Sequence, residues 1–339
     1  MFGQISIPWN DRRLAAGGAA LLVLALVVNG CAEPAPAPDL AERVPGSDRP
    51  RLLVLGTVQD GGLPHAGCAC SHCERARNDR DDARLIASLA ILLPNPREVH
   101  LIDATPDLRR QLDRARPHRP SSAAGLDRSP VDGVFLTHAH WGHYTGLGFF
   151  GFEAIHARGL PVHCSPTMAE FLALNGPWSQ LVEFGNIQLL PFEIGRSIAL
   201  GQGVSVGPIQ VPHRDEYADT VGFVIEGPGR RVLYVPDTDS WPAWTPPLTE
   251  MIAGIDVAIL DGTFYSADEL PGRDVSSIGH PLITDTMDLL ERLVRERGLS
   301  VYFTHLNHSN PALFAETPAR REIESRGFEV LSESQQIPL

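Results

Sequence analysis

The sequence THAHWGHYTG, residues 137–146, has three histidines within six positions: His138, His140 and His143. It follows an apolar run, residues 133–136, that predicts a buried strand. Residues two apart at a strand end point to the same side, and the glycines allow a tight turn that brings the third imidazole close. Neutral imidazole is the commonest nitrogen ligand of zinc-like metals, so the stretch predicts a metal site. Hydrogen-bonded loop histidines without a metal are the weaker alternative.

Outward from this stretch, apolar β-branched runs alternate with turn residues, which is typical of a protein with many strands and few helices. The runs expected to form strands are residues 51–58, 88–94, 98–105, 133–140, 161–166, 187–193, 204–213, 221–227, 231–239, 257–264 and 300–309. Helical spacing of apolar residues occurs at 105–116, 165–174 and 281–298. Residues 51–339 are therefore expected to form one α/β domain, with two sheets and the helices outside them.

Polar residues that can bind metals occur at or just after the ends of these apolar runs. They are Asp103, His138, His213, Asp237, Asp261 and His305. Rigid strands that end in loops can hold several side chains in one site. The pattern therefore predicts one shared site built from residues far apart in the chain.

The histidine stretch resembles the His-x-His-x-Asp-His signature of the metallo-β-lactamase fold, an αββα sandwich with a metal centre at one edge. VPHRDEYADTVGFVIEGPGRRVLYVPDTDSW, residues 211–241, and YFTHLNHSNP, residues 302–311, resemble later motifs of that family. The resemblance extends over residues 51–339. It implies one metal held by His138, His140, His213 and Asp237, and a second held by His143, Asp237 and His305.

Gly142 departs from that signature, because the family has an aspartate ligand of the second metal at this position. Glycine offers no side-chain ligand, so the second metal is expected to bind more weakly or to be a different ion. Asp261 is a candidate replacement, which the sequence leaves open. A Gly142→Asp substitution is expected to tighten binding of the second metal.

Three of the five cysteines lie together in GCACSHCERAR, residues 67–77. A Cys-x-Cys-x-x-Cys group is too compact to pair in disulfides without an odd thiol, whereas one metal can hold all three thiolates. Cys68, Cys70, Cys73 and His308 resemble the structural zinc site of a branch that contains pyrroloquinoline-quinone biosynthesis protein B and phosphoribosyl cyclic phosphodiesterase. The resemblance implies a closed zinc site with three cysteines and one histidine. Redox-active or disulfide-bonded cysteines are the alternative.

The resemblance also implies a function. It suggests a metal-dependent hydrolase of a phosphodiester or related ester, with a metal-bound hydroxide as the nucleophile. One or two divalent ions are expected at the catalytic centre, with zinc first and manganese or iron as alternatives. His280 and Asp103 are the candidate catalytic side chains: His280 as a proton donor, and Asp103 as a partner that orients a ligand histidine. An iron-dependent oxygenase similar to the quinone-biosynthesis protein and a non-catalytic metal-binding lipoprotein are the other functions considered.

The N-terminus, residues 1–30, resembles the signal peptide of a bacterial lipoprotein. Two arginines precede an apolar run that is short for a bilayer span, and Gly30 precedes Cys31. Cleavage there and lipidation of Cys31 would anchor an exported protein on the periplasmic side, in the outer membrane. Residues 31–50, rich in proline and alanine, are expected to form a tether. An uncleaved anchor or a plain secretory signal is the alternative.

The net charge of −13 argues against a nucleic-acid partner, because affinity for a phosphate backbone depends on lysine and arginine. It does not exclude a small anionic substrate, since a bound metal reverses the local field. The expected partners are therefore a small molecule at the metal centre and a membrane at the lipid anchor.

Overall fold

The computed structural model describes residues 48–119, 129–270, 272 and 278–339. The predicted signal peptide, Cys31 and nearly all of the predicted tether lie outside the described residues. Within the described ranges, no helix combines the length and the apolar character needed to cross a membrane.

Two sheets of seven strands each form the centre of the domain. The first sheet has the order β14-β1-β2-β3-β4-β5-β6. Its strands are β1 (Arg51–Gly56), β2 (Ser88–Pro94), β3 (Arg97–Ile102), β4 (Gly133–Phe135), β5 (Leu160–Cys164), β6 (Ile187–Pro191) and β14 (Gln336–Pro338). The second sheet has the order β13-β12-β11-β10-β9-β8-β7. Its strands are β7 (Ile198–Gly201), β8 (Val204–Gln210), β9 (Val221–Glu226), β10 (Arg231–Val235), β11 (Val257–Asp261), β12 (Ser300–Thr304) and β13 (Glu329–Val330).

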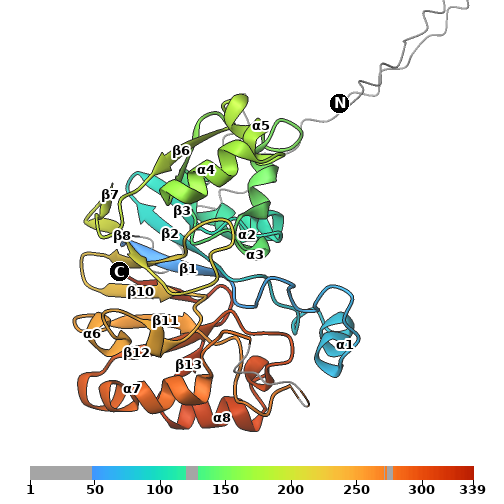
Figure 1. Ribbon diagram of the computed structural model, residues 1–339, viewed down its shortest axis with the longest axis vertical. Coiled ribbons are helices and arrows are strands. Elements are labelled where there is room, and N and C mark those ends of the chain that lie inside the picture. Colours follow the sequence, from blue (N-terminus) through green and yellow to red (C-terminus); the bar gives the residue numbers. More distant parts are fainter. Residues whose placement is uncertain (1–47, 120–128, 271, 273–277) are drawn as a thin grey trace, which may run out of the picture. The chain divides into compact units, whose positions relative to one another are not determined.

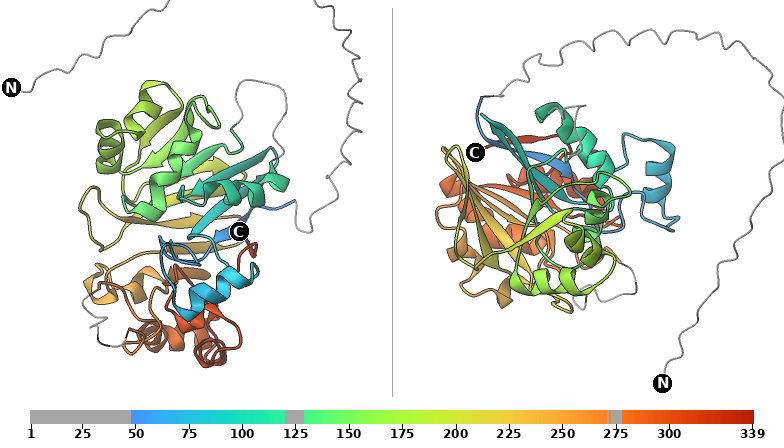
Figure 2. Two further views of the ribbon diagram at one scale, coloured as in Figure 1. Left: turned by 90° about the vertical axis from the view of Figure 1, so that its right-hand side faces the viewer. Right: turned by 90° about the horizontal axis from the view of Figure 1, so that it is seen from above.

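The helices lie outside the sheets, which confirms the αββα sandwich expected from the sequence (Figure 1). Those beside the first sheet are α2 (Leu108–Ala115), α3 (Trp141–Tyr144), α4 (Pro166–Leu174) and α5 (Trp178–Glu183). Those beside the second sheet are α6 (Leu248–Met251), α7 (Ile283–Arg297) and α8 (Pro318–Ser325). Helix α1 (Ser71–Asn78) carries part of the cysteine group and lies to one side of the sandwich (Figure 2).

A buried apolar layer joins the facing surfaces of the two sheets. The Phe135 and Phe223 rings, one from each sheet, meet edge to face with their centroids 5.8 Å apart. Separate apolar layers attach the helices to the outer face of each sheet. Strands β1, β2 and β11 are buried on both faces and read in the sequence as continuous apolar runs, whereas burial alternates along β7 and β8.

Strand direction decides where the site forms. Strands β3 to β6 are parallel, and so are β10 to β13. Strand β1 is antiparallel to β2, which is antiparallel to β3, so β1 and β3 run the same way. By the same logic β8 runs with β10. The loops that follow all these strands therefore leave the sandwich at carboxyl ends, where α/β folds commonly place their binding sites.

Candidate metal centre

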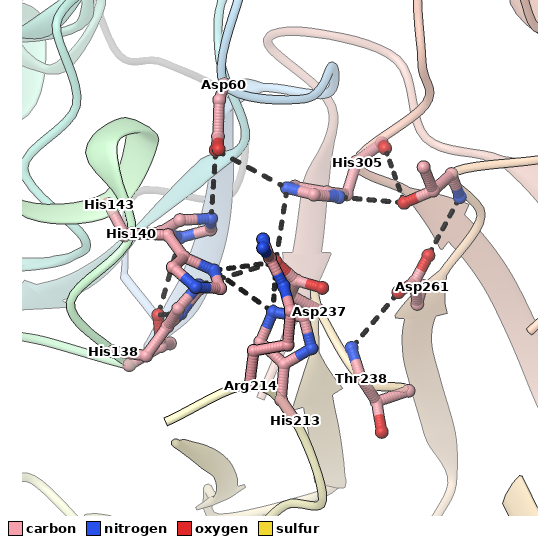
Figure 3. Close-up of polar contacts among 12 residues, drawn as sticks. Asp60, His138, His140, His143, His213, Arg214, Asp237, Thr238, Asp261 and His305 are labelled. Atoms are coloured by element: carbon pink, nitrogen blue, oxygen red, sulfur yellow. Dashed lines mark hydrogen bonds and ion pairs between the residues drawn. The ribbon is translucent and has the colours of Figure 1, made fainter. Parts of the chain in front are cut away.

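Four predicted ligands come together on these loops. His138 and His140 follow β4, His213 follows β8, and Asp237 follows β10. One ligand atom of each lies within 4.8 Å of all the others. Asp237 Oδ2 is 3.4 Å from His138 Nε2 and 3.2 Å from His213 Nε2, and Figure 3 shows the carboxylate among the imidazoles. The residues predicted for the first metal thus form one donor set.

A second group lies next to the first. His143 lies in α3 and His305 follows β12, as predicted for the second metal, and the structure adds Asp60 from the loop after β1. Asp60 Oδ1 is 3.4 Å from His143 Nε2 and 3.8 Å from His305 Nε2. His305 Nε2 is also 3.8 Å from Asp237 Oδ2. Asp237 therefore lies between the two groups (Figure 3).

In each of the five histidines, one ring nitrogen contacts a side chain that lies outside the centre; this is the outer nitrogen, and the other is the inner nitrogen. The Thr137 hydroxyl donates to the Asp103 carboxylate, and the Thr263 hydroxyl donates to the carbonyl oxygen of His305. Each hydroxyl therefore accepts a hydrogen bond from the imidazole that contacts it. An outer nitrogen that donates leaves the inner nitrogen with a free lone pair, the form that binds metals. The outer contacts are His138 Nδ1 with Thr137 Oγ1 at 2.9 Å, His140 Nε2 with Glu216 Oε2 at 3.0 Å, His143 Nδ1 with Asp103 Oδ2 at 2.7 Å, His213 Nδ1 with Asp239 Oδ1 at 2.7 Å, and His305 Nδ1 with Thr263 Oγ1 at 2.9 Å.

The inner atoms fit divalent cations. Those that are buried without a hydrogen-bond partner are Asp60 Oδ1, His138 Nε2, His143 Nε2, Asp237 Oδ1 and His305 Nε2. Unpaired buried polar atoms cost free energy, so five in one place require an explanation. Separations of 3.2 to 3.8 Å between carboxylate and imidazole are long for hydrogen bonds. They are close to the roughly 3.4 Å between two ligands that each lie about 2.1 Å from a tetrahedral zinc.

The electrostatics of the two carboxylates also favours cations. Although burial favours the neutral acid, the positive potential of His305 and His280 holds the pKa of Asp237 well below its usual range. The pKa of Asp60 is likewise low, because interactions with His143 and His305 outweigh its burial. Both side chains are therefore anionic, as ligands of divalent cations must be.

The structure contradicts the expectation that Gly142→Asp would tighten the second metal. A Cβ on Gly142 would lie 2.1 Å from Asp60 Oδ1 and 2.8 Å from Asp60 Cα, too close for real atoms. A side chain at this position would therefore displace Asp60. Asp261 does not join the group of Asp60, His143 and His305; it lies instead with Asp237, His280 and His305, and its Oδ2 accepts from Thr238 N at 3.1 Å and from His280 Nδ1 at 2.8 Å.

Asp103 lies behind His143, away from the inner ring nitrogens. Its fully buried carboxylate accepts from His143 Nδ1 at 2.7 Å and from Thr137 N at 2.9 Å. Asp103 and His305 both have left-handed backbones, with φ of 66° and 61°. Such conformations persist at non-glycine residues where surrounding contacts enforce them, often in functional sites. The geometry makes Asp103 a positioning residue rather than one that touches substrate.

His280 borders both the centre and a cavity of about 540 Å³. Its Nδ1 donates to Asp261 and lies 3.3 Å from Asp237 Oδ1. Although burial favours the neutral ring, the carboxylates of Asp261 and Asp237 raise the pKa of His280 to about 9. The cavity wall includes Trp241 and Leu248, and the volume suits a small molecule.

Three carboxylates in the site were missed in the sequence, Asp60, Asp239 and Glu216, and so were the hydroxyls of Thr137 and Thr263. Asp60 follows the first predicted strand, residues 51–58, and Asp239 comes two residues after Asp237, so the strand-end pattern could have found both. Glu216 lies in a loop and carries no such signal.

The cysteine group also gathers as predicted. The sulfur atoms of Cys68, Cys70 and Cys73 lie within 4.8 Å of one another, and all three thiols are free. Cys73 Sγ accepts from His65 N at 3.2 Å. Burial and the neighbouring thiols raise the pKa of Cys73 to about 12. Because only a cation would stabilise three thiolates here, the group fits a metal better than free thiols.

His308 lies beside the cysteines but outside the group of three sulfurs. Its carbonyl oxygen accepts from His72 Nδ1 at 3.0 Å, and its ring centroid is 4.3 Å from that of His65. His308 Nδ1 is buried without a hydrogen-bond partner. Its assignment as the fourth zinc ligand stays a prediction, with His65 as a second imidazole close by.

Comparison with known proteins identifies the family. Residues 99–306 match the beta-lactamase superfamily domain. Coenzyme PQQ synthesis protein B of Methylobacterium sp. (strain 4-46) is 28% identical over 300 residues, 83% of this chain and 97% of that protein. Zn(2+)-bound PqqB from Methylobacterium extorquens has a TM-score of 0.72 at 23% identity, covering 85% of this chain and all of that one. A diphosphatase of the PhnP family has a TM-score of 0.59 at 22% identity, covering 86% and 99%.

Proposed function

Because the chain belongs to the beta-lactamase superfamily, we propose that it is a metal-dependent hydrolase that cleaves a phosphodiester or a related ester. One observation carries the proposal: five imidazoles, each held at its outer nitrogen, direct their inner nitrogens toward two carboxylates in one centre. One cation would be held by His138, His140, His213 and Asp237, and a second by His143, Asp237 and His305. Zinc suits these ligands, and manganese or iron are the alternatives.

When bound, the cations would lower the pKa of coordinated water and neutralise charge on the substrate oxygens. The outer partners Asp103, Asp239 and Glu216 keep the imidazoles in place before substrate arrives. In hydrolysis, water adds to phosphorus, and one ester oxygen leaves with the electrons of its bond and takes a proton. His280 Nδ1 is engaged by Asp261, so Nε2 is the nitrogen left to protonate that oxygen.

The cavity beside His280 is the proposed site for the leaving group. Trp241, Leu248 and Leu282 provide apolar surface, and Asp239 and Asp285 lie on the same wall. Negative side chains there would repel a second phosphate but accept an uncharged organic group. We therefore propose a small ester whose phosphoryl oxygens contact the metals and whose apolar alcohol portion enters this cavity.

Turnover of a phosphodiester tests the proposal. Bis(4-nitrophenyl) phosphate is expected to be hydrolysed by the metal-loaded protein, and the activity should disappear with a chelator and return with zinc or manganese. For a phosphodiester whose leaving group is a simple alcohol, His280→Gln should lower turnover about 100-fold and leave the bound metal unchanged, because the variant lacks only the proton donor; 4-nitrophenolate leaves without a proton, so its release should change little. No turnover with any divalent ion would exclude the proposal, and loss of metal from His280→Gln would make His280 a ligand instead.

A second candidate is oxidation chemistry at an iron centre, supported by similarity to coenzyme PQQ synthesis protein B over 83% of the chain. Imidazole and carboxylate ligands suit iron as well as zinc. Protein purified without oxygen and loaded with Fe²⁺ would then consume oxygen. The hydrolase proposal predicts no oxygen uptake under these conditions.

We also propose that the mature protein is a lipoprotein that begins at Cys31, which rests on the sequence of residues 1–31 alone. Export would bring the centre into contact with small molecules outside the cytoplasm. The expressed full chain should partition with membranes, and Cys31→Ser should block processing and raise the apparent mass by the uncleaved signal. An unmodified Cys31 in a soluble wild-type protein would disprove the anchor.

A further inference from the structure

Asp60 occupies the space that a side chain at position 142 would need. Its Oδ1 lies 2.1 Å, and its Cγ and Cα each 2.8 Å, from the Cβ that Gly142 lacks. Gly142 itself is buried in α3, directly before His143. The absence of a side chain on this glycine is therefore what allows a carboxylate from the loop after β1 to approach the centre.

Backbone pairing holds Asp60 beside His305. Leu306 N donates to Thr57 O, and Gln59 N donates to Leu306 O, each at 3.0 Å. This short parallel contact joins the loop after β1 to the loop after β12. The residues next to the pairing, Asp60 and His305, consequently point their ligand atoms toward the same spot (Figure 3).

The contacts of Asp60 differ from those of a carboxylate that only orients histidines. Asp103 has that role for His143, at a hydrogen-bonding distance of 2.7 Å. Asp60 Oδ1 instead faces the inner nitrogens of His143 and His305 at 3.4 and 3.8 Å, and forms no hydrogen bond. Because the outer nitrogens of both rings are already engaged, the three inner atoms lack only a cation between them.

We propose that Asp60 supplies the carboxylate of the second metal, in place of the aspartate that Gly142 replaces. The second cation would then have four protein ligands, Asp60, His143, Asp237 and His305. Asp60 restores the negative charge that Gly142 lacks, so the second site should not bind its cation as weakly as Gly142 alone would suggest. This inference rests on the proposed two-metal centre and identifies one of its ligands.

Zinc binding to the metal-free protein tests this assignment. Zinc per chain is measured by elemental analysis over a series of buffered free-zinc concentrations. Asp60→Ala is expected to lower affinity for the second catalytic ion at least about tenfold, since it removes an anionic ligand, and to leave binding of the other ions unchanged.

Asp113→Ala is the matched control, because it removes an exposed carboxylate on α2, and it should bind zinc as wild type does. Asp60→Asn keeps the volume, should fold if Asp60→Ala does not, and should weaken the same ion.

Position 142 provides the reciprocal test. Gly142→Asp alone is expected to weaken the second ion, because its Cβ displaces Asp60. Asp60→Gly combined with Gly142→Asp should bind that ion more tightly than Gly142→Asp alone, since Gly61 and Gly62 let the loop adjust. The assignment fails if folded Asp60→Ala and Asp60→Asn bind the second ion as wild type does, or if Gly142→Asp binds it more tightly. If wild type itself binds no ion at the histidines, the proposed function fails instead.

Discussion

Asp237→Asn is expected to abolish binding of the second catalytic ion and to lower affinity for the first by more than about 100-fold. That loss exceeds the roughly 10- to 100-fold loss of metal affinity that is typical when a residue hydrogen-bonded to a ligand is replaced. The reason is that Asp237 is the carboxylate shared by both donor groups, with His138, His213 and His305 each 3.2 to 3.8 Å from its Oδ2. Asparagine keeps the volume but removes the charge. Hydrolysis of the phosphodiester should fall at least about 1,000-fold, and elemental analysis should find only the zinc of the cysteine group.

Asp256→Asn is the matched control for this substitution. Asp256 is exposed and lies just before β11, at the opposite end of the sheet from Asp237. Its replacement should change neither metal content nor turnover. If Asp237→Asn retains both catalytic ions, Asp237 does not bridge the two groups, and the account of the centre is wrong.

Cys73→Ser is expected to remove about one zinc per chain and to lower the Tm by about 5 to 15 °C, because a structural zinc contributes several kcal/mol to folding and each kcal/mol is worth about 2 to 4 °C. The side chain is fully buried, and its sulfur accepts from His65 N. The loop that contains His65 also contains Asp60, five residues earlier. A secondary weakening of the second catalytic ion should therefore accompany the loss.

Cys164→Ser separates loss of zinc from loss of a buried thiol. Cys164 is also fully buried, but it is the last residue of β5 in the first sheet and belongs to a different apolar layer from the cysteine group. Its replacement is expected to lower the Tm without changing zinc content. A Cys73→Ser protein with full zinc content and an unchanged Tm would show that the group does not bind a structural metal.

The parts of the fold that follow from apolar pattern were predictable. All eleven predicted strand runs contain an observed strand, from β1 to β12 with β7 omitted, and the three predicted helices correspond to α2, α4 and α7. Strands β7, β13 and β14 were missed, and each has four residues or fewer; β4 is as short, but its apolar run continues to Leu136. Helices α1 and α8 were missed because few of their residues are buried, which leaves little apolar periodicity to detect. Helices α3, α5 and α6 were missed as well, and each has six residues or fewer.

The site was predictable where ligands follow strong strands, and less so where they depend on contacts between loops. His213, Asp237 and His305 each come directly after an apolar run, and the structure brings all three to one centre. The place of Asp60 depends on the pairing of Gln59 with Leu306, some 250 residues away in the chain, which no local pattern reveals. Gly142 is the one local signal of that contact, since it marks a position where another group comes close.

The most direct test of the account is the number of zinc ions that the metal-free protein takes up. Elemental analysis after stepwise addition of Zn²⁺ should reach three ions per chain, one at the cysteine group and two around Asp237. The chelator-sensitive phosphodiesterase activity should appear only as the ions around Asp237 bind. A plateau at one ion per chain that Cys73→Ser abolishes would mean that the histidines bind no zinc, and it would contradict the two-metal centre on which the proposed function depends.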